Sequence, residues 1–133
     1  MKIKSLLGVT ILIVAAAWFS GCTTMADAQR ARGTGAKVAY QASFDEIWAA
    51  LPGVVKAAGL EFITANREDR SVLAQRGITA FSYGENVAIF VEKVEETKSS
   101  VEVVSKKAMT TNVFAPDWAK PIFEQLDKKF KRG

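Results

Sequence analysis

The side chains that most often carry out catalysis are nearly absent from this chain of 133 residues. It contains no histidine, which is the commonest general base and zinc ligand, and a single cysteine, Cys22. Two adjacent carboxylate pairs remain, Asp45-Glu46 and Glu95-Glu96, and paired carboxylates are what glycoside hydrolysis requires. The first pair lies at a predicted helix start and the second in a predicted hairpin turn, where solvated charge is expected. We therefore expect no enzymatic activity, no catalytic residue, no metal and no cofactor.

Cys22 follows a segment typical of an exported bacterial protein. Lys2 and Lys4 precede an uncharged run of 14 residues, from Leu6 to Phe19. A spanning helix needs about 20 apolar residues, whereas the apolar part of a signal peptide has about 7 to 15. The pattern predicts a secretory signal over residues 1–21. Lipidation accounts for a solitary cysteine in an oxidising compartment; an uncleaved signal with a free thiol is the alternative.

The residues Phe19-Ser20-Gly21-Cys22 resemble the lipobox of bacterial lipoproteins, although Leu is usual where Phe19 stands. The resemblance implies cleavage before Cys22, a diacylglycerol on its thiol and acylation of the freed amine. Several acyl chains anchor stably, whereas a single chain binds membranes only marginally. Thr23 stands where Asp would favour retention in the inner membrane. The resemblance therefore implies a lipid-anchored protein of the cell envelope, at the outer membrane and facing the periplasm.

The rest of the chain divides into a tether and one small domain. Residues 22–35 have almost no large apolar side chain, which predicts a flexible lipidated tether with a reach of about 20 Å. Residues 36–133 are long enough for a single core. Without Lys2 and Lys4, the 18 basic side chains become 16, against 14 acidic ones, and no basic stripe with interleaved aromatics is present. We expect no nucleic-acid partner.

Hydrophobic periodicity predicts seven elements in this domain. A helix follows the first strand, with a capping box at Ser43 and Glu46, Trp48 packed against the sheet, and Gly59 as its left-handed cap. Pro52 predicts a kink or a division into two shorter helices. The predicted strands are 37–41, 60–66, 71–76, 86–94 and 99–105, and the last helix is 118–131. Leu60, Phe62 and Thr64 are expected to share one face of their strand.

The order β-α-β-β-β-β-α predicts an α+β fold. Because hairpins join the last four strands, we expect an antiparallel sheet of four to five strands with two helices on one face. The stretch from Tyr40 to Trp48, then Ala57 to Leu60 and the meander that follows, resembles small bacterial lipoproteins of unknown function. Such domains are similar to the helix-grip folds of accessory lipoproteins of outer-membrane protein assembly, and the resemblance carries over no catalytic residue.

Two features are candidates for an interaction surface. Phe81 and Tyr83 lie in a glycine-bracketed loop, where they are either an interface anchor or a cover for the core. Phe90 is predicted to point away from the helices, near Ile63, Leu73 and Val104, which is an unusually apolar outer face for an antiparallel sheet. This face is either exposed to a partner or covered by the last helix or by residues 106–116.

Two functions fit these features. The first is a non-enzymatic, membrane-anchored adaptor or accessory subunit that meets another envelope protein. The alternative is a small binder of an apolar, lipid-like ligand held between the helices and the sheet. A cavity of several hundred Å³ inside the domain would favour the ligand binder.

Overall fold

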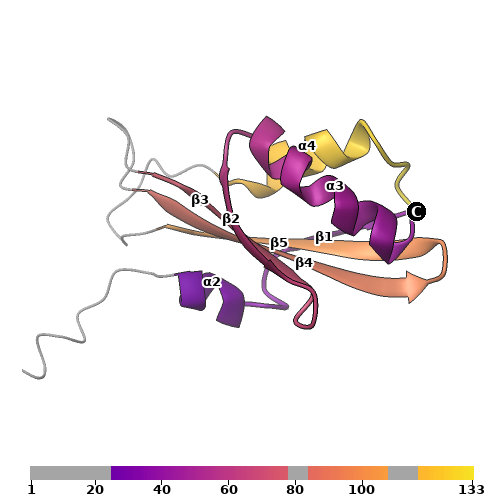
Figure 1. The fold of residues 1–133 in the computed structure, drawn as a ribbon, viewed down its shortest axis with the longest axis horizontal. Helices are drawn as coiled ribbons and strands as arrows, with labels where there is room; N and C mark the ends of the chain where they lie inside the picture. The colour runs from indigo at the N-terminus through magenta and orange to yellow at the C-terminus, as the bar shows by residue number, and fades with distance from the viewer. Residues whose placement is uncertain (1–24, 78–83, 108–116) are drawn as a thin grey trace, which may run out of the picture.

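The computed structural model describes residues 25–77, 84–107 and 117–133, which form a five-stranded antiparallel sheet with helices on both faces (Figure 1). The predicted α+β class, and the predicted order of elements from residue 36 onward, are confirmed. The elements are α2 (Met25–Arg30), β1 (Ala36–Tyr40), α3 (Phe44–Ala57), β2 (Glu61–Asn66), β3 (Ser71–Arg76), β4 (Glu85–Glu95), β5 (Lys98–Lys107) and α4 (Ala119–Asp127).

The strands lie in the order β1-β5-β4-β3-β2, so β1 and β2 are the two edges of the sheet. The long hairpin of β4 and β5 forms its centre, with Ile89 opposite Val103 and Phe90 opposite Glu102. Ile89 packs with the helices α3 and α4, whereas Phe90 packs on the other face. The predicted alternation along β4 is therefore confirmed.

Helix α3 begins and ends where the sequence predicts. The Ser43 hydroxyl accepts from the Glu46 amide at 3.2 Å, and the Glu46 carboxylate accepts from the Ser43 amide at 2.8 Å, which is the predicted capping box. Gly59 has φ +92° and follows the last turn with the two backbone hydrogen bonds of a Schellman motif. Pro52 does not divide the helix, so the predicted alternative of two shorter helices is wrong.

The main core lies between the sheet and the layer made by α3 and α4. Six of its fully buried side chains come from these helices: Ile47, Leu51, Val54, Val55, Ile122 and Leu126. Trp48 is only partly buried at the rim of this core, where it stacks on Phe44 with ring centres 5.4 Å apart. The prediction that α3 packs Trp48 against the sheet is confirmed only in part, because Trp48 contacts the main core but stays partly exposed, whereas Ile47 and Leu51 are fully buried.

The opposite face of the sheet is covered by residues that the sequence predicted to be a tether. Helix α2 lies across β3, β4 and β5 (Figure 1), and Ala28 is fully buried against Ala88, Phe90 and Val104. The prediction of a flexible tether is therefore wrong for residues 25–35, which we call the strap. Composition misled here because the strap binds the sheet with a small alanine, backbone amides and an arginine rather than with large apolar side chains.

Candidate functional site

The strap is held by a buried carboxylate. Glu102 is 4% exposed and accepts hydrogen bonds from the amides of Gly33, at 2.9 and 2.8 Å, and of Gly35, at 2.9 Å. A Cβ at Gly35 would lie 2.2 Å from the carbonyl oxygen of Val103, so only glycine lets the backbone come this close. Hydrogen bonds to a charged acceptor are among the stronger ones in proteins. The strap is thus bound by a specific contact.

Arg32 makes the second group of strap contacts. Its guanidinium lies 4.4 Å from the centre of the Phe90 ring and 3.8 Å from the Glu92 carboxylate, and it donates to the backbone oxygen of Asp69. Gln29 reaches the Asp69 side chain at 3.4 Å. The strap therefore connects the central strands to the tip of the β2–β3 hairpin.

These contacts determine whether the residues predicted to form an interaction surface are accessible. Phe90 lies on the predicted face beside Leu73 and Val104, but it is 1% exposed beneath the strap. The prediction that it offers an accessible surface is wrong, because residues 25–35 cover it. Phe81 and Tyr83, like the predicted lipid attachment residue Cys22, lie outside the described residues.

One edge of the sheet is closed by the end of the chain. The Gln41 amide donates to Lys131 at 2.7 Å, and the Gly133 amide donates to Ala39 at 2.9 Å, so the last residues pair with β1. The Tyr40 hydroxyl donates to Asp127 at 3.0 Å, and the side chain of Arg132 donates twice to the same carboxylate, at 2.9 Å each. The C-terminal residues thus cap the end of β1 near Tyr40.

This cluster shifts the pKa values of its members. Burial, and then the hydrogen bond to Asp127, raises the pKa of Tyr40 well above its ordinary value. The hydrogen bonds from Arg132 lower the pKa of Asp127. Perturbed groups often mark active sites, but here the phenol stays protonated and the carboxylate stays ionised, which fastens the C-terminal residues to β1.

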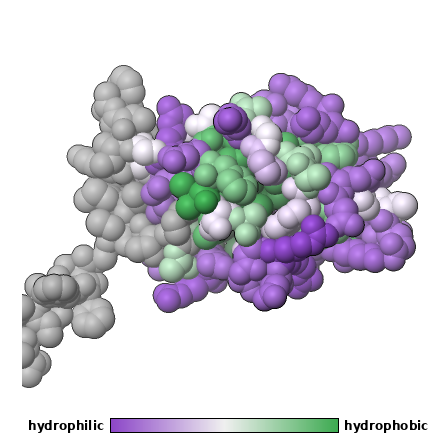
Figure 2. Space-filling model, in the orientation of Figure 1, coloured by the Kyte–Doolittle hydropathy of each residue, from purple (hydrophilic) through white to green (hydrophobic). Residues whose placement is uncertain are grey.

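The other edge of the sheet is bare. β2 pairs with β3 alone, and its second side meets no strand in the described ranges. All of its residues are exposed, including Phe62 at 38% and Ile63 at 43%. Figure 2 shows apolar side chains gathered in the middle of this face, over β2 and beside α3, with a polar surround. An exposed edge strand with apolar side chains is a template for pairing with another chain.

A β-bulge interrupts the alternation of β2. Phe62 pairs with Ala74 and Thr64 with Leu73, so Ile63 is the extra residue between them. Ala74 belongs to the main core and Leu73 to the outer face. The prediction that Phe62 and Thr64 share a face is wrong, because the bulge reverses the alternation within the strand.

A hollow of about 510 Å³ adjoins this edge, between β2 and the outer side of α3. Its lining is Pro52, Gly53, Lys56, Leu60, Glu61 and Phe62. No atom lies within 4 Å of the place that a Cβ on Gly53 would occupy, which agrees with open space beside this residue. The hollow could take a side chain from a segment that pairs with β2. Sequence reasoning did not single out this surface, because no local pattern shows that the strand of Phe62 lies at an edge of the sheet.

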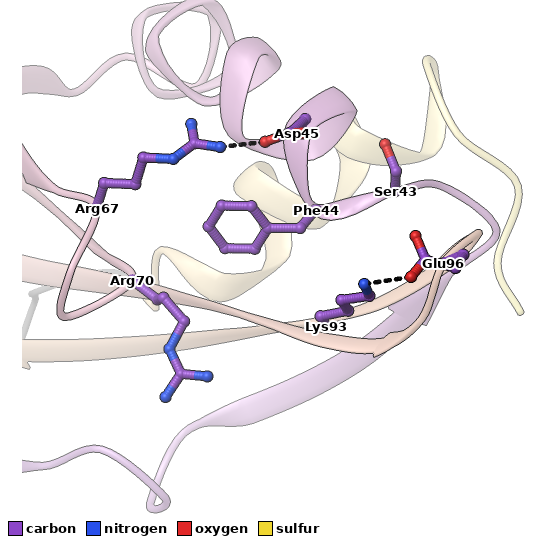
Figure 3. Close-up of a pocket in the computed structure, with 7 residues that line it drawn as sticks. All are labelled: Ser43, Phe44, Asp45, Arg67, Arg70, Lys93 and Glu96. Carbon is purple, nitrogen blue, oxygen red and sulfur yellow. Dashed lines mark hydrogen bonds and ion pairs between the residues drawn. The ribbon is translucent and has the colours of Figure 1, made fainter.

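A second hollow, of about 320 Å³, lies between the start of α3, the tip of the β2–β3 hairpin and the end of β4 (Figure 3). Arg67 pairs with Asp45 and lies 5.3 Å from the centre of the Phe44 ring, and Lys93 pairs with Glu96 at 2.6 Å. The paired side chains are all more than half exposed. Such exposed ion pairs contribute little energy, and we assign no chemistry to this hollow.

The remaining observations bear on cofactors, membranes and relatives. In the ranges that the structure describes, no group of three or more metal-ligating side chains is placed to hold an ion. Among the described helices, none is long and apolar enough to cross a bilayer. No protein-family model matches the chain, and no curated protein is significantly similar to it in sequence.

Proposed function

We propose that this chain is a non-enzymatic adaptor or accessory subunit of the bacterial cell envelope. It is anchored through lipid on Cys22, at the outer membrane and facing the periplasm, and it meets a partner protein through the β2 edge. The anchor is supported by the uncharged run that ends before the solitary Cys22. The adaptor role is supported above all by the contrast between the two sheet edges, one capped by the chain's own end and one bare.

The bare edge suits an extended segment of a partner. A strand laid beside β2 would use the backbone groups that β3 leaves unpaired, and its alternate side chains would contact Phe62 and the adjoining hollow. Main-chain hydrogen bonds supply affinity in this mode, and the side-chain hollow supplies selectivity. The mode needs no catalytic group, which agrees with the residues that the chain offers.

The alternative of a lipid-like ligand inside the domain gains no support from the described residues. The space between the sheet and the helices α3 and α4 is occupied by side chains, among which Leu51, Ile122 and Leu126 are fully buried. The two hollows described above lie on the surface. We therefore place the adaptor first.

Photo-crosslinking in intact envelopes tests this function. A photoreactive amino acid is placed at Ile63, or at Val94 as a matched control, since both are exposed aliphatic strand residues and only Ile63 lies on β2. We expect a discrete higher-mass adduct from position 63 and none from position 94. With the crosslinker moved to Phe62, Ile63→Lys should remove the adduct, because a charge on an edge strand opposes pairing.

Equal adducts from both positions, or none from position 63, would contradict the proposed partner contact at the β2 edge.

The lipid anchor is tested by a separate measurement. Intact mass spectrometry of membrane-extracted protein should show loss of residues 1–21 and an acyl-glycerol adduct on Cys22, and a Cys22→Ser chain should leave the membrane fraction. A Cys22→Ser chain that stays membrane-bound at mature size would refute the anchor. It would leave the proposed partner contact at the β2 edge untested by that result and open to the crosslinking experiment.

A further inference from the structure

The strap has a defined direction across the sheet. Its later part, at Arg32, lies over Phe90 and beside Glu92, whereas Ala28 lies against Ala88 and Val104. Going back along the strap therefore moves toward the start of β4 and the end of β5. Figure 1 shows the same arrangement, with the first residue of α2 toward the end of the sheet where β3 ends and β4 begins. We call this end the proximal end.

The length of chain before α2 limits where Cys22 can lie. Met25 is the first residue of the helix, only three residues after Cys22. Three residues span at most about 10 Å even when fully extended. The 13 residues of the tether that composition predicted would instead have a root-mean-square reach of about 20 Å in any direction. A lipid on Cys22 would therefore hold the start of α2 within about 10 Å of its attachment point.

Charged side chains of both signs lie at the proximal end. Arg76 closes β3, Lys106 lies near the end of β5, and Lys120 lies in the first turn of α4, which adjoins the end of β5. The carboxylates of Glu61, Glu85 and Asp117 lie in the same region, and Glu85 is the residue opposite Arg76. These charges balance, so the short connection to Cys22, and not charge, indicates which end of the domain faces the membrane.

We propose that the strap orients the domain on the membrane, so that the proximal end faces the bilayer and the β4–β5 turn points away from it. This inference rests on the proposed anchor at Cys22. The bare β2 edge then runs from the membrane toward the periplasm, where a partner reaches it. The lipid attaches the chain to the membrane. The strap, because it is bound to the sheet, fixes which end of the domain lies nearest to that attachment.

Single-site labelling of the full acylated chain tests the orientation. Because Cys22 is the sole cysteine and is acylated, a cysteine introduced elsewhere is the one reactive thiol. An environment-sensitive fluorophore is attached at Lys120→Cys, at the proximal end, or at Thr97→Cys, in the β4–β5 turn. The protein is reconstituted in vesicles of phosphatidylethanolamine and phosphatidylglycerol that carry a headgroup quencher. We expect at least threefold stronger quenching at position 120 than at position 97.

Two changes should abolish this difference while flotation with the vesicles persists. A flexible insert of about 20 Gly and Ser residues between Thr24 and Met25 leaves the strap docked but lengthens the connection to about 25 Å. Glu102→Ala removes the acceptor of the Gly33 and Gly35 amides and releases the strap. Far-ultraviolet circular dichroism shows whether the Glu102→Ala chain is folded, and the insert variant carries the test if it is not.

The outcomes separate the two proposals. Failure of the full chain to float with vesicles would refute the anchor and, with it, the orientation. Flotation with equal quenching at positions 97 and 120, or a quenching difference that survives the insert, would refute the orientation alone.

Discussion

At the scale of single residues, the side chains with the strongest contacts in this structure serve the fold. Glu102 is a buried carboxylate that faces backbone amides, and Asp127 binds a phenol and a guanidinium. For Asp127, the hydrogen bonds from Arg132 favour the ionised carboxylate and lower its pKa. Neither side chain was singled out from the sequence, because their partners lie 67 to 69 residues away in the first case and up to 87 in the second.

The Tyr40 phenol predicts a specific alkaline instability. Because its pKa is raised in the folded protein, the unfolded chain loses this proton first, so the stabilisation is complete below pH about 10 and is lost as the pH rises further. Tyr40→Phe should cost about 1 kcal/mol at pH 7, from one lost hydrogen bond. Urea unfolding of both proteins at pH about 8 and about 11 measures the effect.

We expect the difference in unfolding free energy between the wild type and Tyr40→Phe to shrink at the higher pH. Lysine titration affects both proteins alike, so the difference isolates Tyr40. A difference that stays constant between the two pH values would show that Tyr40 ionises equally in the folded and unfolded chains.

At the scale of elements, α3 and α4 bury the predicted apolar faces, but the depth of burial in α3 and the length of α4 differ from expectation. Helix α3 follows its caps closely, but its buried stripe is centred on Ile47 and Leu51 and leaves Trp48 at the rim. Helix α4 ends at Asp127, short of the predicted residue 131, because the following residues turn back to pair with β1. Periodicity identifies that a helix is amphipathic, but neighbouring elements decide how much of the stripe is covered.

The packing of α3 predicts an unequal response to truncation. Leu51→Ala should cost about 2 to 5 kcal/mol, because it leaves a cavity among fully buried side chains. Trp48→Ala should cost about 1 to 3 kcal/mol although it removes a larger group, since Trp48 keeps part of its surface in solvent. Denaturant unfolding of the two variants checks the order, and a larger loss for Trp48→Ala would mean that the rim position is misassigned.

At the scale of the whole molecule, the strap moves the start of the folded unit from residue 36 to residue 25. Without the strap the sheet would show Phe90, Ala88 and Val104 to solvent on its outer face. The strap covers this face and joins it to the β2–β3 hairpin through Asp69. Among the described residues, the β2 edge stays open, and the adaptor proposal depends on this edge.

A comparison of two fragments measures what the strap contributes. Residues 25–133 should unfold with a free energy about 2 to 4 kcal/mol above that of residues 36–133, chiefly from covering Phe90 and from the Glu102 hydrogen bonds. The denaturant slope should also be larger, because more surface becomes exposed on unfolding. Chemical denaturation of both fragments gives the two quantities.

Glu102→Ala provides the control for that comparison. It should destabilise residues 25–133 and have little effect on residues 36–133, where the partners of the carboxylate are missing, so the two changes should not add. Equal effects in both fragments would mean that Glu102 stabilises the sheet by itself and that the strap is dispensable.

The sequence by itself determined the elements whose signals are local. The capping box at Ser43, the left-handed cap at Gly59, the strands and their hairpins, and the opposite orientations of Ile89 and Phe90 all depend on residues close together in the chain. Only the tertiary structure decided what covers each surface. The strap docks through backbone amides on a distant carboxylate, and the bulge at Ile63 redirects a strand. Almost every residue carries the same backbone groups, so composition and periodicity do not reveal which of these groups make long-range contacts. The burial of Phe90 and the opposite faces of Phe62 and Thr64 are the consequences.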